Sequence, residues 1–257
     1  MNDPVRSHLL EELSWPEVKA AIDADTVVIL PLGAIEQHGH QLPIDTDDYL
    51  ATRLALAGAE QAGALVAPSP SYGCRSRPGS GGGEQFPGTL SLSGATFIAM
   101  VAEVIGGILR HGFRRLLVYS WHMENRGFAY EAAFQASERY PTARIVVMEE
   151  PFDSLTDGSM QSLFPNGFPG WPLEHAGVLE TSLMLYLRGS VVGRGAPPGD
   201  RIEARPYEVL PQPPVSEGQT GVLWESAGAE AEKGRLAYEE IVAKLTAVLV
   251  REFGGVS

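Results

Sequence analysis

The chain has 257 residues, of which 44% are hydrophobic and 20% charged, and its formal net charge at pH 7 is −13. This length and composition favour one globular domain over residues 1–257. The negative charge argues against nucleic acid or an anionic membrane surface as a partner, and no apolar run is long enough to span a bilayer. Cys74 is the only cysteine and the first residues do not resemble a signal peptide, so we expect a cytoplasmic protein.

Apolar strands alternate with amphipathic helices along most of the chain. We expect strands over residues 26–33, 64–67, 114–119 and 144–148, and helices over 7–22, 47–62, 94–110, 126–139 and 229–252. Residues 68–92 indicate a long loop, and residues 190–227 show no clear period. This alternation is typical of an α/β fold with a mainly parallel central sheet and helices on both faces. Ligands of such sheets bind beyond the carboxyl ends of the strands, where loops from different strands converge.

The loop after the first expected strand is dense in side chains that bind metal ions. Glu36 and His38 are separated by one residue, so in extended backbone their side chains point to the same face. Together with Asp47 they supply the carboxylates and neutral imidazole that Zn²⁺ and Mn²⁺ prefer. The alternative is a polar loop in which Asp47 or Asp48 caps the next helix, and this motif alone leaves both interpretations open.

A second histidine–carboxylate pair, His122 and Glu124, follows the strand expected over residues 114–119 with the same spacing. A lone histidine at a strand end more often has a structural role, but two such pairs at one edge of a sheet are harder to explain in that way. With Asp47, the two pairs provide five candidate ligands. Two ions that share a bridging carboxylate would use all five.

Two further loops are candidates for substrate contact. Three glycines after Ser80 let the backbone approach a small ligand closely, although a flexible surface loop would also be rich in glycine. Residues 168–182 contain Trp171, His175 and Glu180 and lead into a helix. A histidine just ahead of a helix suits proton transfer, and Glu180 could orient it or hold a water molecule. Ordinary packing of Trp171 and a solvated helix face for Glu180 are the alternatives.

Four motifs in the same order make the chain resemble the creatininase (creatinine amidohydrolase) family. They are a Glu-Gln-His-Gly motif with an aspartate eleven residues after the glutamate (Glu36 to Asp47), a Ser-Gly-Gly-Gly…Phe-Pro-Gly-Thr loop (Ser80 to Thr89), a His-x-Glu-Asn motif (His122 to Asn125) and a Gly-Trp-x-x-Glu-His-x-Gly-x-x-Glu-Thr-Ser segment (Gly170 to Ser182). The resemblance extends over about residues 26–190.

This resemblance implies a three-layer α/β/α sandwich, a homohexamer and a hydrolase with two divalent metal ions. It assigns Glu36, Asp47 and His122 to one ion, which is Zn²⁺ or Mn²⁺. It assigns His38, Asp47 and Glu124 to the other, which is usually Zn²⁺, so that Asp47 bridges the two.

The resemblance also implies roles in binding and proton transfer. Ser80, Trp171 and His175 would contact the substrate, and His175 would transfer a proton. We take Glu124 and Glu180 as further candidates for the catalytic proton transfer, since both are carboxylates in the same motifs.

The sequence departs from the family pattern at four positions: His40, Gln41, Met123 and Phe152. Met123 and Phe152 stand where creatininase has a tyrosine and a tryptophan beside the substrate, so these two bear on which substrate is bound. We predict a metal-dependent amidohydrolase that opens a small cyclic amide, creatinine or a close analogue. The alternatives are another amidohydrolase, a deformylase or a cyclic-ketone hydrolase of the same superfamily. A binding protein without turnover is disfavoured by the complete ligand set and by His175.

Overall fold

The structure is a computed structural model that describes residues 7–148, 154–195, 198–211 and 218–254. Its centre is a four-stranded sheet in the order β2-β1-β3-β4, in which every pairing is parallel. The strands are β1 (Val28–Leu32), β2 (Leu65–Val66), β3 (Arg115–Ser120) and β4 (Arg144–Met148). The parallel sheet predicted from the alternating pattern is therefore confirmed.

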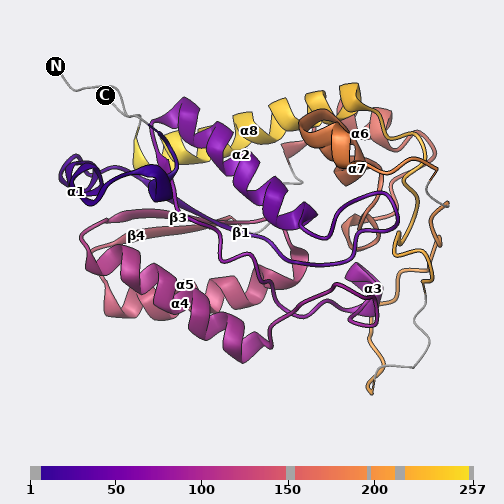
Figure 1. Ribbon diagram of the computed structural model, residues 1–257, viewed down its shortest axis with the longest axis horizontal. Coiled ribbons are helices and arrows are strands. Elements are labelled where there is room, and N and C mark those ends of the chain that lie inside the picture. Colours follow the sequence, from indigo (N-terminus) through magenta and orange to yellow (C-terminus); the bar gives the residue numbers. More distant parts are fainter. Residues whose placement is uncertain (1–6, 149–153, 196–197, 212–217, 255–257) are drawn as a thin grey trace.

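Helices cover both faces of this sheet, giving the expected three-layer α/β/α sandwich (Figure 1). One face carries α2 (Thr46–Ala62), α6 (Asp157–Leu163), α7 (Val178–Arg188) and α8 (Ala231–Phe253). The other face carries α4 (Gly94–Arg110) and α5 (Arg126–Arg139), with α1 (Trp15–Asp23) at the edge of that layer.

Strand side chains alternate between the two cores, as the pleat of a strand requires. Ile29, Leu117 and Tyr119 pack with the layer of α2, α7 and α8. Their neighbours Leu30 and Leu116 pack with α4 and α5. Because both faces are covered, the strands read as continuous apolar runs.

The structure divides the helix that we predicted over residues 7–22. A short 3-10 turn (Leu10–Glu12) comes first, and α1 begins only at Trp15. Ser14 is the N-cap residue of the new helix, and its backbone N–H donates to Glu17 Oε2 at 2.7 Å as part of a capping box. Pro16 lies in the first turn, where its missing N–H costs nothing, so a restart of the helix is favoured there. The short helices α3 (Pro78–Gly81) and α6 were not predicted either.

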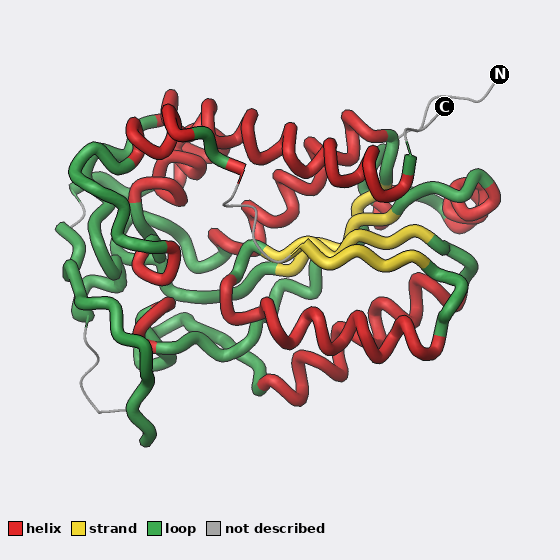
Figure 2. Tube along the Cα trace, turned by 180° about the vertical axis from the view of Figure 1, so that it is seen from behind, coloured by secondary structure: helices red, strands yellow, loops and turns green. Residues whose placement is uncertain are grey.

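The loops that follow the strands gather at one end of the sheet (Figure 2). Gly33 lets the start of α2 dock against the end of β1, because a Cβ at this position would lie 2.3 Å from the Asp48 Cα. This close approach brings Asp47, in the first turn of α2, into the loops at the carboxyl end of the sheet. Among the described helices, none combines the length and hydropathy that a membrane-spanning segment needs.

Candidate metal centre

Glu36, Asp47 and His122 come together in a buried cluster at the carboxyl end of the sheet, with one ligand atom of each within 4.8 Å of the others. His122 Nδ1 lies 3.3 Å from Glu36 Oε2 and 3.1 Å from Asp47 Oδ2. The three residues come from the loop after β1, the first turn of α2 and the end of β3, which converge as the parallel sheet predicted. This is the set that the family resemblance implies for the first ion.

Two backbone carbonyls fix the tautomers of the two histidines nearest these carboxylates. His38 Nδ1 donates to the Glu36 carbonyl at 3.0 Å, and His122 Nε2 donates to the Cys74 carbonyl at 3.0 Å. A carbonyl oxygen only accepts, so each of these nitrogens carries the proton. The opposite nitrogens, His38 Nε2 and His122 Nδ1, carry the lone pair of the neutral imidazole and face Asp47 at 3.2 and 3.1 Å. This is how imidazole is held when it binds a metal ion.

The cluster has an excess of negative charge. Burial by itself would lower the pKa of His38, but the charges of Asp47 and Glu180 outweigh it and raise that pKa to about 10. The pKa of His122 is likewise raised, because the neighbouring Glu36 and Asp47 outweigh burial. The carboxylates thus favour positive charge on both imidazoles. A bound divalent cation would neutralise the same excess of negative charge.

Several atoms in the cluster are buried without a hydrogen bond. They are both carboxylate oxygens of Glu36, Nε2 of His38 and Oδ2 of Asp47, and none has a hydrogen-bond partner among the described residues. Buried polar atoms are normally satisfied, so an orphaned set of this kind calls for an explanation. Two carboxylates and two correctly oriented imidazoles are the donor set of a Zn²⁺ or Mn²⁺ site, and the residues present fit such ions.

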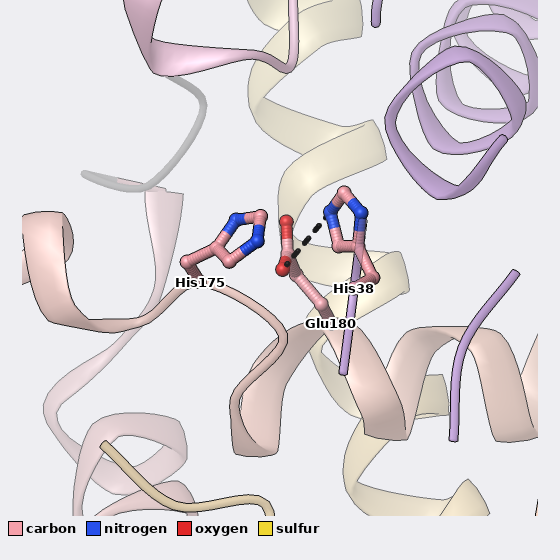
Figure 3. Close-up of side chains that lie close together, drawn as sticks. All are labelled: His38, His175 and Glu180. Atoms are coloured by element: carbon pink, nitrogen blue, oxygen red, sulfur yellow. Dashed lines mark ion pairs between the residues drawn. The ribbon is translucent and has the colours of Figure 1, made fainter. Parts of the chain in front are cut away.

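A second cluster joins His38 to His175 and Glu180 (Figure 3). His38 Nε2 lies 3.7 Å from Glu180 Oε2, and the rings of His38 and His175 are 4.4 Å apart between centroids. Glu124 belongs to neither cluster. Its Oε2 lies 3.7 Å from His122 Nε2, on the far side of that ring from Asp47, and Ser80 and Arg77 contact its Oε1. The predicted ligand Glu124 is thus adjacent to the site but turned from it.

Two glutamates hold the loop that carries His175 just ahead of α7. Glu174 Oε1 accepts the N–H of Leu179, and Glu180 Oε2 accepts the N–H of Ala176, both at 2.7 Å. Ala176 has a φ of +53°, a left-handed conformation that an alanine seldom adopts unless its surroundings impose it. The helix start therefore holds His175 in place through its neighbours on both sides.

The proton of His175 can be assigned from its partner Gln37. The side-chain nitrogen of Gln37 donates to the carbonyls of Gly81 at 3.1 Å and Gly221 at 3.0 Å, which uses both of its N–H groups. His175 Nε2 lies 2.8 Å from the backbone carbonyl oxygen of Gln37, which can only accept, and therefore donates to it. Nδ1 of His175 is left with its lone pair, 4.0 Å from Glu36 Oε2. This nitrogen is the one that can exchange a proton at the site.

The predicted substrate residues line a small pocket over the cluster. Ser80, Met123 and Trp171 contribute to its wall together with His175, and its volume is about 30 Å³. Trp171 is held in an aromatic group, with its ring 4.5 Å from that of Phe168. Phe152 lies outside the described residues.

Sequence reasoning missed several residues that shape this site. Trp121 donates from Nε1 to Glu180 Oε1 at 3.0 Å, and Glu174 lies in the pocket wall. Gly221, in the segment with no clear period, lies so close to Gln37 that a Cβ would come within 1.9 Å of its Oε1. Gln37 belongs to the Glu-Gln-His-Gly motif, but its partners are far away in the sequence, so no role for it could be assigned from the sequence.

Comparison with known proteins places this α/β sandwich with its buried carboxylate–imidazole cluster in a known class. The family model described as creatinine amidohydrolase matches residues 11–249. A creatinine amidohydrolase from Pseudomonas putida is 39% identical over 96% of this chain and 98% of its own. The chain belongs to the creatininase family.

Solved structures agree with the family model. A manganese form of creatininase superposes with a TM-score of 0.89 at 39% identity, covering 96% of this chain and 99% of its own. A Zn–Zn form of a creatininase variant gives a TM-score of 0.90 at 38% identity, with the same coverage of both chains.

Proposed function

We propose that the protein is a metal-dependent amidohydrolase that opens a small cyclic amide, creatinine or a close analogue, and that residues 1–257 form one catalytic domain. The observation that carries the proposal is the buried cluster of Glu36, Asp47, His38 and His122 with its orphaned ligand atoms. Full-length similarity to a creatinine amidohydrolase supports the choice of reaction.

Two divalent ions, Zn²⁺ with Zn²⁺ or Mn²⁺, would occupy this site. We propose Glu36, Asp47 and His122 as ligands of one ion and His38, Asp47 and Glu124 as ligands of the other. When bound, such ions lower the pKa of a shared water and polarise the carbonyl of an amide. Zinc and manganese forms among the structural neighbours support these ions.

The remaining residues of the site bind the substrate and move a proton. Trp171 and Met123 provide apolar walls for a small ring, and Ser80 lies at the same pocket. Nδ1 of His175 can take up a proton and deliver it to the ring nitrogen that leaves, because Nε2 is held by Gln37. Glu124 and Glu180 remain as further candidates for this transfer.

Hydrolysis of a cyclic amide adds one water molecule to the substrate, so mass spectrometry tests the proposal directly. Protein loaded with Zn²⁺ or Mn²⁺ should convert creatinine, or another member of a panel of small cyclic amides, into the ring-opened product. Absence of turnover for the whole panel by protein that demonstrably holds both ions would contradict the proposed reaction.

Paired substitutions of Glu124 and Glu180 should identify the ligand that completes the second site. We expect Glu124→Ala to lose one ion per chain and Glu180→Ala to keep both. Both oxygens of Glu180 already accept an N–H, from Trp121 and from Ala176, so this carboxylate has a structural task. Elemental analysis after dialysis measures the difference. The opposite result would assign the second ion to the cluster of His38, His175 and Glu180.

We also propose a cytoplasmic homohexamer. The proline-rich part of the chain exposes apolar side chains, with Tyr207 61% and Leu210 84% exposed, and α5 exposes Tyr130 and Phe134. Contacts between copies would remove such surface from water. Light scattering at micromolar concentration should give about six times the 27.6 kDa mass of one chain. The mass of a single chain would rule the assembly out.

A further inference from the structure

A second and much larger pocket, here called the outer pocket, adjoins the small pocket over the metal cluster, here called the inner pocket. Its volume is about 710 Å³, and it shares Met123, Glu124 and Trp171 with the wall of the inner pocket. The inner pocket is much the smaller of the two, at about 30 Å³, and Asp47, His122 and His175 line it. Because the two pockets share wall residues, a substrate that reacts over the metal cluster can extend from the inner pocket into the outer one.

The charge of the outer pocket is opposite to that of the protein. Among the residues that the structure describes, Arg75, Arg77 and Arg126 line it together with one carboxylate, that of Glu124. The whole chain carries a net charge of −13, with only 19 basic residues among 257. A group of three arginines around one opening is thus a local reversal of charge, and it would attract an anion toward the metal cluster.

Two of these arginines keep donors available for a ligand. Arg75 pairs with Glu84 at 2.9 Å and Arg77 with Glu124 at 3.4 Å, and in both ion pairs the arginine contributes its Nε. The other guanidinium nitrogens carry further N–H groups in the planar fork that matches a carboxylate. Both arginine side chains are more than half exposed, whereas the Glu124 carboxylate is buried. The pair of Arg75 with Glu84 is a surface ion pair, which contributes little that would oppose a new partner.

The backbone adds to this positive potential. The first residues of α4 and α5 lie in the wall of the outer pocket, through Gly94 on one helix and Arg126 and Gly127 on the other. A helix of 17 residues and one of 14 residues thus direct their positive ends to the pocket that the arginines line. Phe128 closes one side, with its ring so near Gly94 that a Cβ there would lie 2.4 Å from Cε1.

We propose that the outer pocket binds a carboxylate of the substrate. The substrate class is then a small cyclic amide with an acidic side chain that reaches from the ring over the metal cluster to Arg75, Arg77 and Arg126. This inference rests on the proposed hydrolase function and specifies its substrate. Creatinine, which has no side chain of this kind, would leave the outer pocket unfilled.

A pair of ligands that differ only in charge tests the inference: hydantoin acetate and hydantoin acetamide. Their binding to the metal-loaded protein is measured by calorimetry and their ring opening by mass spectrometry. The variants are Arg126→Gln and, as a matched control, Arg139→Gln at the other end of α5. Charge-assisted hydrogen bonds contribute enough that wild-type protein should bind the acid at least about tenfold more tightly than the amide.

Arg126→Gln should reduce this preference by about tenfold, while Arg139→Gln should leave it as in the wild type. Equal affinity of the wild type for acid and amide, or equal loss of preference in the two variants, would overturn the inference. Failure of the proposed function would look different, because the protein would then open no cyclic amide, charged or neutral, whatever the binding measurements show.

Discussion

The Asp47→Ala variant should lose both metal ions, and its turnover should fall by at least about 10⁴-fold. Asp47 faces both lone-pair nitrogens of the cluster, with His38 Nε2 at 3.2 Å and His122 Nδ1 at 3.1 Å, so we propose it as a ligand of both ions. Its loss removes the activation of water, which contributes roughly 10²–10⁴-fold to the rate. It also removes the stabilisation of the oxyanion, which contributes roughly 10²–10³-fold. Elemental analysis and steady-state kinetics on the same preparation measure both effects.

Asp45→Asn is the matched control for this change. Asp45 lies two residues away and pairs with Arg188 at 2.8 Å, with both side chains more than a third exposed. Loss of such a surface pair costs little stability, and we expect both ions and full activity to remain. Circular dichroism checks that the Asp47→Ala variant is folded. If the folded variant kept one ion tightly bound, Asp47 would not be a ligand of both ions.

His175→Ala should leave both ions in place and reduce turnover by about 10²–10⁴-fold, the usual contribution of a general acid or base. The reason lies in its hydrogen bonding. Nε2 donates to the Gln37 backbone carbonyl, and Nδ1 faces the cluster at 4.0 Å from Glu36 Oε2. This geometry suits a group that exchanges protons at Nδ1, and the ligands that we propose for the two ions are other residues.

His40→Ala controls for the loss of an imidazole near the site, because His40 is close in sequence to the ligands but exposed. It should keep wild-type turnover and metal content. A His175→Ala variant that lost an ion would make His175 a ligand, in line with its place in the cluster with His38 and Glu180. Full activity in that variant would instead assign the proton transfer to Glu180 or Glu124.

The convergence of Glu36, Asp47 and His122 was predictable from the sequence because it depends on simple geometry. Side chains at alternate positions share a face, and the carboxyl ends of parallel strands meet at one edge. Glu36 and His122, which are distant in sequence, therefore meet at 3.3 Å. The predicted helix positions were right to within two residues where the apolar period was long, as in α4 and α8.

Other features depend on contacts that no local pattern encodes. Gln41 stands where the family usually has a histidine, and its Nε2 donates to the Ala176 carbonyl at 2.9 Å and to Thr181 Oγ1 at 3.3 Å. It thus supports the loop of His175, a role that could be seen only in the folded chain. The orientation of Glu124 toward Ser80 could not be predicted from a local pattern either, because it depends on where α3 lies in the folded chain.

A titration of metal-stripped protein tests the central claim most directly. Zn²⁺ or Mn²⁺ is added in steps, and bound ions and hydrolysis of a cyclic amide are measured on the same samples. We expect no turnover before addition, and a rise to a plateau when each chain holds two ions. Two results would contradict a metal-dependent function of Glu36, His38, Asp47 and His122. One is turnover by the metal-stripped protein, and the other is failure to bind any divalent ion that is added.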